Sequence, residues 1–199
     1  MKILKTYQVF NESKEQKERI YEYGCCLLNF DFPEMEEIQH MIDPDDIYND
    51  PDNPSRFGLE DKPHVTLLYG FNDGGDNKYL DKSQVDKILD ISSNIDGEIL
   101  LTNLSIFTND NYDVLKFEAE CEDLHRINKD LMDNFDYTTD FPDYKPHCTI
   151  AYLKPGTGKK YINRIKKDFN VIPKEIVYSR PNIEGDKKEE FRKKIEIDQ

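Results

Sequence analysis

Residues 62–69 read KPHVTLLY and residues 145–152 read KPHCTIAY, so one pattern occurs twice, 83 residues apart. Both copies predict short β-strands, because β-branched and apolar residues follow a proline that suits a strand's first position. Side chains alternate across a strand, so the histidine and the threonine of each copy share one face. The residues expected on the opposite, apolar face are Val65, Leu67, Cys148 and Ile150. Side by side, the two strands would bring together four polar side chains that we interpret as an active site: His64, Thr66, His147 and Thr149.

Two histidines in such a cleft suit acid–base chemistry on a phosphodiester. Cleavage by a neighbouring hydroxyl, or by water on a cyclic phosphate, needs a base for the nucleophile and an acid for the leaving oxygen. Imidazole, with an unperturbed pKa of about 6.5, serves in either role. One ring must be neutral while the other is charged, which predicts a bell-shaped pH–rate profile. The threonine hydroxyls would donate to the non-bridging phosphate oxygens.

Other kinds of site fit the repeat less well. We expect no metal and no other cofactor, because two histidines and two threonines without a carboxylate form a poor ligand set for a metal. A serine-type nucleophile would need an elbow motif that the chain lacks. Coincidental structural histidines are the remaining alternative, and the matching Lys-Pro and Tyr flanks of both copies count against it.

Length and charge limit the possible partners. A chain of 199 residues suits one well-buried domain, or one domain of two similar lobes. Its formal net charge of −14 argues against broad binding to long nucleic acid, which needs basic surfaces. A small phosphorylated ligand held by a few local cations is compatible with that charge.

The chain also shows no sign of membrane insertion or export. No run approaches the roughly 20 apolar residues that a membrane-spanning helix needs. The N-terminus lacks the apolar core and cleavage site of a signal peptide. The four cysteines, which show no metal-ligand spacing, are expected to be buried, reduced thiols of a cytoplasmic protein: Cys25, Cys26, Cys121 and Cys148.

Periodicity and turn residues predict an α+β domain over residues 23–199. In the first half, the expected elements are a strand at 23–30, a helix from Pro33 to Met41, a long acidic loop at 43–61, the first His strand and a helix capped by Asp81. A hairpin at 98–107 and 112–119, a helix at 122–135 and the second His strand follow. The chain then continues with a helix capped by Thr157 and running through Phe169, a strand at 174–178 and a charged tail with a solvated face. The repeat suggests two lobes related by a pseudo-twofold axis. His40 and His125 are expected at the surface.

Several residues near the motifs are candidates for contacts with a substrate. Cationic and aromatic side chains of this kind are Arg56, Lys62, Tyr144 and Lys145. Tyr69 and Tyr152 also follow the motifs closely. On a regularly alternating strand they would face away from the histidines, so we expect them to pack in the core.

The two motifs, His64-Val65-Thr66-Leu67 and His147-Cys148-Thr149-Ile150, resemble the signature of the 2H (two-histidine) phosphoesterase superfamily over residues 23–180. The resemblance implies a bilobal fold of two antiparallel sheets, flanked by helices, with a central cleft. It also implies that His64 and His147 are the acid and the base, in an order that stays open, and that the two threonines hold the phosphate. Within the superfamily the chain looks most like the phage anti-CBASS proteins, which implies a cyclic oligonucleotide substrate.

Other functions remain open. The alternative enzyme is an RNA 2′,3′-cyclic phosphodiesterase or a 2′–5′ ligase-like protein that acts on RNA ends. The non-enzymatic alternatives are a protein that sequesters cyclic nucleotides and a virion protein. The latter arises because KTYQVF at residues 5–10 resembles the opening of capsid-targeting peptides of T-even-like phages. Residues 1–22 are therefore either an ordinary N-terminal arm or a targeting segment. The implied location is the cytoplasm, which is that of the host cell if the protein is phage-encoded. Packaging in the virion is the alternative location. The oligomeric state stays open.

Overall fold

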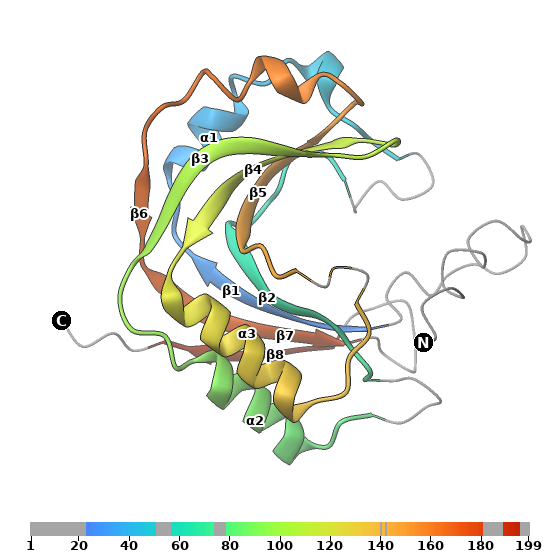
Figure 1. The fold of residues 1–199 in the computed structure, drawn as a ribbon, viewed down its shortest axis with the longest axis vertical. Coiled ribbons are helices and arrows are strands. Elements are labelled where there is room, and N and C mark those ends of the chain that lie inside the picture. The colour runs from blue at the N-terminus through green and yellow to red at the C-terminus, as the bar shows by residue number, and fades with distance from the viewer. Residues whose placement is uncertain are drawn as a thin grey trace, which may run out of the picture.

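The computed structural model describes residues 23–50, 57–73, 79–139, 141, 143–180 and 189–195. Within these ranges the strands form two antiparallel sheets of four strands each (Figure 1). Sheet A has the order β2-β1-β7-β8, and its strands are β1 Gly24–Phe30, β2 His64–Phe71, β7 Pro173–Arg180 and β8 Glu189–Lys194. Sheet B has the order β5-β4-β3-β6, and its strands are β3 Ile99–Thr108, β4 Asp113–Glu120, β5 His147–Leu153 and β6 Phe169–Val171. The predicted α+β class with two antiparallel sheets is confirmed.

The repeated motif occupies the same place in both sheets. It begins β2 at the edge of sheet A and β5 at the edge of sheet B. These two edge strands contact each other where the sheets meet, while the rest of each sheet diverges (Figure 1). The two histidine strands are therefore central in the molecule, as the repeat predicts.

Helices cover one side of each sheet. Helix α1 (Glu34–Gln39) packs against β5, and α3 (Glu122–Asn134) packs against β2. Helix α2 (Lys82–Ser92) contacts β1, β7 and β8. Its predicted capping box is present, because the Asp81 side chain accepts from the Gln84 N–H at 2.9 Å and the Gln84 side chain accepts from the Asp81 N–H at 3.0 Å.

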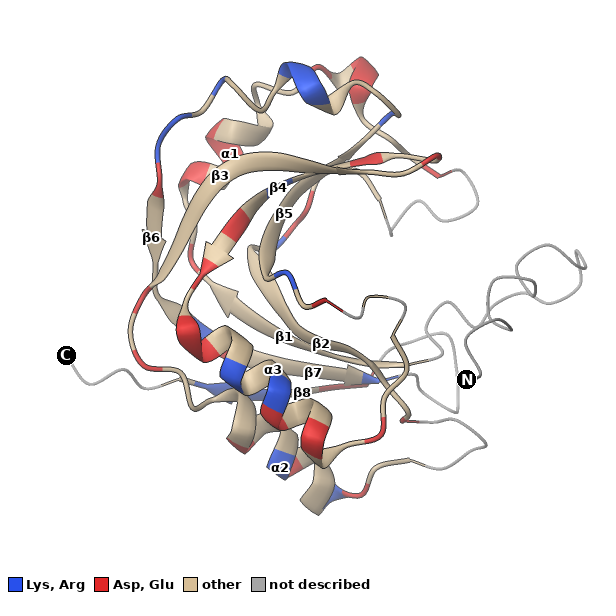
Figure 2. Ribbon diagram, in the orientation of Figure 1, with Lys and Arg blue, Asp and Glu red and all other residues tan. Residues whose placement is uncertain are grey.

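The core lies between these helices and the sheets. The four apolar motif residues, Val65, Leu67, Cys148 and Ile150, are fully buried in it, as predicted. Charged residues instead line the outer helices, where acidic and basic side chains alternate along α2 and α3 (Figure 2). None of the helices in the described part of the chain is long and apolar enough to cross a membrane.

One prediction for the C-terminal part is wrong and another is incomplete. The helix expected from Thr157 to Phe169 is only a 3-10 turn, Gly158–Lys160, and Phe169 begins strand β6. The buried Asp113 carboxylate accepts from the Gly158 N–H at 2.9 Å, which anchors the turn against β4. The charged stretch is largely exposed, as expected for a solvated face, but it also forms the unpredicted strand β8 along β7, and its Lys193 makes an ion pair with Asp90 of α2 at 2.7 Å.

The cysteine prediction holds only in part. None of the four cysteines forms a disulfide, and Cys26 and Cys148 are fully buried. Cys25 and Cys121 are half-buried. Burial raises the pKa of the Cys26 and Cys148 thiols to about 12, so these two are protonated and unreactive near neutral pH.

Candidate active site

The first motif contains a β-bulge directly after its threonine. Along the β1–β2 ladder Thr66 pairs with Leu27, and Leu68 pairs with Cys26. Leu67 is therefore an extra residue in β2, with no partner in β1. A bulge of this kind shifts the alternation of the side chains that follow it.

The second motif contains the same bulge at the equivalent position. Along the β4–β5 ladder Thr149 pairs with Lys116, and Ala151 pairs with Leu115. The extra residue is Ile150, which corresponds to Leu67 in the repeat. The two copies therefore share a backbone irregularity as well as a sequence pattern.

The bulges overturn the prediction for Tyr69 and Tyr152. Because each strand has one extra residue after its threonine, both tyrosines return to the face that carries the histidine and the threonine, which we call the histidine face of each sheet. Burial agrees with this register. Tyr69 is 42% exposed and Tyr152 is half-buried, whereas the preceding Leu68 and Ala151 lie in the core.

Both imidazoles are held by the same local hydrogen bond. The His64 Nδ1 lies 2.8 Å from the Lys62 carbonyl oxygen, and the His147 Nδ1 lies 2.7 Å from the Lys145 carbonyl oxygen. A carbonyl can only accept, so Nδ1 carries the proton in both rings. Nε2 is therefore the nitrogen that each ring presents for proton transfer, as an acceptor when neutral and as a donor when charged.

The surroundings of the two rings differ. Burial lowers the pKa of His147, and the positive charge of Lys116 and the neighbouring His64 lower it further, while the bond to the Lys145 carbonyl opposes them. On the other side of the site, a carboxylate oxygen of Glu60 lies 3.8 Å from the His64 Nδ1. Burial raises the pKa of Glu60, and His64 opposes that effect. His147 is thus favoured in the neutral form, whereas His64 has the carboxyl group of Glu60 beside its Nδ1.

The long loop before β2 supplies this carboxylate from the other lobe. Its described residues run beside β5, where Tyr48 N–H donates to the Tyr152 carbonyl at 2.9 Å and Glu60 N–H donates to the Ile150 carbonyl at 3.1 Å. The loop therefore joins sheet B before it enters β2 of sheet A. This anchoring places Glu60 beside His64, a contact that the sequence did not predict.

The two threonines lie beside the histidines on the same faces. Thr149 is 7% exposed and Thr66 is half-buried. Neither hydroxyl makes a hydrogen bond to another residue in the described part of the chain. Each hydroxyl can act as a donor, and the predicted bonds from Thr66 and Thr149 to phosphate oxygens stay a prediction.

Lys116 is a buried residue beside the second motif that the sequence did not single out. It faces Thr149 across the β4–β5 ladder and is only 4% exposed. Its Nζ lies 3.5 Å from a Glu118 carboxylate oxygen and 4.3 Å from the centre of the Phe107 ring, which packs edge-on against His147. Burial lowers the pKa of this lysine. A buried cation with one long ion pair thus lies next to the second motif.

The remaining sequence candidates have mixed outcomes. The Tyr144 hydroxyl donates to the Thr66 carbonyl at 2.9 Å, so it links the approach to β5 with β2. The Lys62 and Lys145 side chains are exposed, and the definite role of these residues is to orient the histidines through their carbonyl groups. Substrate contacts by these three side chains stay a prediction. Arg56 and the N-terminal arm, residues 1–22, lie outside the described residues.

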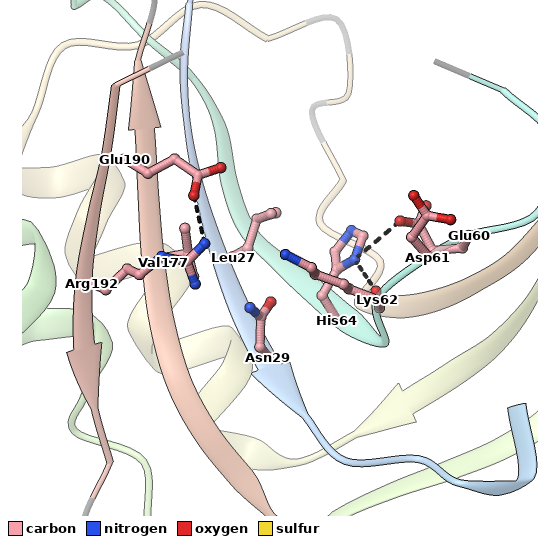
Figure 3. Close-up of a pocket in the computed structure, with 9 residues that line it drawn as sticks. All are labelled: Leu27, Asn29, Glu60, Asp61, Lys62, His64, Val177, Glu190 and Arg192. Carbon is pink, nitrogen blue, oxygen red and sulfur yellow. Dashed lines mark hydrogen bonds and ion pairs between the residues drawn. The ribbon is translucent and has the colours of Figure 1, made fainter. Parts of the chain in front are cut away.

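A cavity of about 240 Å³ lies next to His64 on the histidine face of sheet A (Figure 3). Strands β1, β2, β7 and β8 and the end of the long loop form its walls. Its lining residues are Leu27, Asn29, Glu60, Asp61, Lys62, His64, Val177, Glu190 and Arg192. Of the four predicted site residues only His64 lines this cavity, so a cleft shared by both histidines and both threonines stays a prediction.

Comparisons with known proteins find similarity only among solved structures. No protein-family model and no curated protein sequence matches the chain. A crystal structure of E. coli LigT complexed with 3′-AMP is 13% identical, covers 87% of this chain and 99% of its own, and has a TM-score of 0.47. LigT in its apo form is 11% identical, with coverage of 87% and 97% and a TM-score of 0.46. A crystal structure of a phosphoesterase is 11% identical, with coverage of 86% and 98% and a TM-score of 0.44. Since these TM-scores lie below 0.5, we infer neither activity nor substrate from them.

Proposed function

We propose that the chain is a metal-independent phosphodiesterase of the 2H type, with His64 and His147 as its acid–base pair. The observation that carries the proposal is the matched pair of bonds from Nδ1 to a carbonyl oxygen, at 2.8 and 2.7 Å. These bonds give two imidazoles the same orientation and leave Nε2 of each for proton transfer. Two coincidental structural histidines would not need the same tautomer, the same bulge and an adjacent threonine.

The surroundings of the rings suggest which histidine is the base. His147, whose pKa is lowered, would accept a proton from water or from a neighbouring hydroxyl as the new P–O bond forms. His64, supported by Glu60, would give its proton to the leaving oxygen as the old P–O bond breaks. Each of these roles typically contributes about 10²- to 10⁴-fold to the rate.

Other groups would stabilise the charge that develops on the non-bridging oxygens. The Thr66 and Thr149 hydroxyls lie beside the two rings, and the buried Lys116 ammonium lies next to Thr149. Donors fixed in a poorly hydrated site stabilise a transition state strongly, because they need little reorganisation. Lys116 would thus add a buried positive charge beside the second motif.

The substrate that we propose is a small cyclic oligonucleotide, cut to a linear product. The net charge of −14 disfavours long nucleic acid, and the motif resemblance to phage anti-CBASS proteins supports a cyclic dinucleotide or trinucleotide. The proposed location is the cytoplasm, where the free cysteines fit a reducing compartment.

A test would incubate the protein in EDTA with 3′,3′-cGAMP, related cyclic oligonucleotides and RNA that ends in a 2′,3′-cyclic phosphate. We expect linear products from the cyclic oligonucleotides, and loss of activity in His64→Ala and His147→Ala. His40→Ala is the matched control, because this exposed histidine lies outside the site.

The alternatives give other results. Activity on RNA ends alone would favour the 2′,3′-cyclic phosphodiesterase or 2′–5′ ligase-like enzyme. Tight binding with unchanged ligand recovered after denaturation would establish a sequestering protein. Full activity in His64→Ala would contradict the proposed mechanism.

A further inference from the structure

The cavity beside His64 contains groups that the acid–base chemistry does not use. Asn29 on β1 lies directly opposite His64 in the ladder, so both side chains project from the histidine face. Leu27, two residues earlier, lies between Thr66 on one side and Val177 on the other. Figure 3 shows Leu27 and Asn29 on the central strand, with His64 on one side and Arg192 on the other.

The cavity combines an apolar floor with a polar wall. Leu27 and the buried Val177 provide neighbouring apolar side chains on adjacent strands. The side-chain amide of Asn29 makes no hydrogen bond to any of the described residues, although it lines the cavity. A side-chain amide without such hydrogen bonds can offer its carbonyl oxygen as an acceptor and its NH₂ group as two donors to a ligand.

The charges in the cavity disfavour a second phosphate. Arg192 is already held by two carboxylates, Glu175 at 2.5 Å and Glu190 at 2.5 Å. The other charged lining residues are Glu60, Asp61 and Lys62, so with the proposed acid His64 the lining has three carboxylates and three cations and no net positive charge. A second phosphate would find no excess of positive charge there, whereas a neutral, hydrogen-bonding group needs none.

The size of the cavity indicates part of a ligand. Sites that enclose a whole drug-sized molecule have volumes of roughly 300–1,000 Å³. A cavity of about 240 Å³ next to a catalytic histidine fits a planar group attached to the phosphate that reacts there. In a nucleotide that group is the base, which stacks on apolar side chains and is read through hydrogen bonds to its edge.

We propose that this cavity is a nucleobase subsite in which Asn29 reads the edge of the base next to the scissile phosphate. The base would lie over Leu27 and Val177, and the ion pair of Arg192 with Glu190 would border its far edge. This subsite rests on the proposed function, since it assumes that a phosphate binds at the histidines. It makes Asn29 a specificity residue and leaves proton transfer to the histidines.

The test measures binding, which does not require turnover. Calorimetry would compare the four nucleoside 3′-monophosphates with the abasic probe 1,2-dideoxyribose 3-phosphate. In the wild-type protein at least one nucleotide should bind about ten-fold or more tightly than the abasic probe, the range expected for recognition of a base edge. In Asn29→Ala the difference should fall to about two-fold or less, because only stacking remains, and Asn29→Asp should change the preferred base.

Asn170→Ala is the matched control, since Asn170 is an exposed asparagine in a strand of the other sheet and should keep the wild-type ratio. A measurement on the wild-type protein covers the case in which an Asn29 variant does not fold. The Asn29 side-chain amide resonance should shift on titration with the preferred nucleotide and stay unchanged with the abasic probe.

The two proposals fail in different ways. Equal affinity for nucleotides and the abasic probe, in a protein that hydrolyses phosphodiesters, would overturn the subsite alone. Base-dependent affinity that Asn29→Ala reduces, in a protein that hydrolyses none of the tested phosphodiesters, would support the subsite and contradict the proposed enzyme.

Discussion

The Asn128 side-chain amide donates to the Leu67 carbonyl at 2.7 Å in the protein interior. Leu67 is the bulge residue of β2, and Asn128 lies on α3, the helix that packs on this strand. The other lobe repeats the arrangement, because the Gln39 amide on α1 donates to the carbonyl of the bulge residue Ile150 at 3.0 Å. A bulge leaves its extra residue unpaired in the ladder, and a buried carbonyl needs a partner. A helix side chain therefore supports each bulge.

Asn128→Leu should destabilise the protein, because it leaves the Leu67 carbonyl without its side-chain donor. The expected loss in the free energy of unfolding is about 1–3 kcal/mol, measured by urea denaturation. Asn134→Leu is the control, since this exposed asparagine lies near the end of the same helix and should change the free energy by about 0.5 kcal/mol or less. Equal effects of the two substitutions would show that the bond does not support the bulge.

A pair of neighbouring substitutions tests the register that the bulge produces. Leu68→Ala should lower the free energy of unfolding by about 2–5 kcal/mol, because Leu68 lies in the core. Tyr69→Ala should cost about 1 kcal/mol or less, because its ring is 42% exposed on the histidine face. A regularly alternating strand predicts the reverse order, so thermal or urea denaturation of the two variants distinguishes the registers.

The repeat was sufficient to predict the two histidine strands and their central position but not the faces of their tyrosines. Alternating polar and apolar residues identify the two strands, and the shared His and Thr positions identify the histidine face of each sheet. A one-residue bulge has no clear signature in either copy, because Leu67 and Ile150 are apolar residues like those around them. The bulges depend on hydrogen bonds from Asn128 and Gln39, which lie far away in the chain.

Lys116→Met should reduce kcat/KM by about ten-fold or more, because it removes a buried positive charge beside the proposed phosphate site. It should also change the pH dependence. Lys116 lowers the pKa of His147, so its removal raises that pKa, and the acidic limb of kcat/KM moves to higher pH. The limb should remain below the range of an ordinary histidine, because burial is the larger cause. An unchanged or lower acidic limb would contradict a role for Lys116 in setting the charge of His147.

A change of leaving group tests the roles of the two histidines. An acid is needed for a poor leaving group such as a sugar hydroxyl, and much less for p-nitrophenolate. His64→Ala should therefore lose about 10²- to 10⁴-fold in kcat on a nucleotide substrate but much less on a p-nitrophenyl phosphodiester. His147→Ala should lose a similar factor on both. The opposite pattern would assign the base to His64.

The burial of Lys116 and the strand β8 are two features that the sequence did not predict. Lys116 lies between Leu115 and Phe117, and a single lysine at such a position is normally a solvent-facing residue of a half-buried strand. It is buried here beside the Phe107 ring of β3 and Thr149 of β5, and it pairs with Glu118. The β8 residues have so many charges that composition indicates a solvated segment, yet partners on β7 and α2 pair with those charges. Both outcomes depend on contacts between distant parts of the chain.

The pH–rate profile for hydrolysis of 3′,3′-cGAMP in EDTA tests the central claim most directly. Two imidazoles that each present Nε2, one neutral and one charged, predict a bell-shaped dependence of kcat/KM in the wild-type protein. His147→Ala should lose the acidic limb and His64→Ala the basic limb, each with a large loss of rate. A profile without two limbs, or one that either substitution leaves unchanged, would contradict the claim that His64 and His147 act together as acid and base.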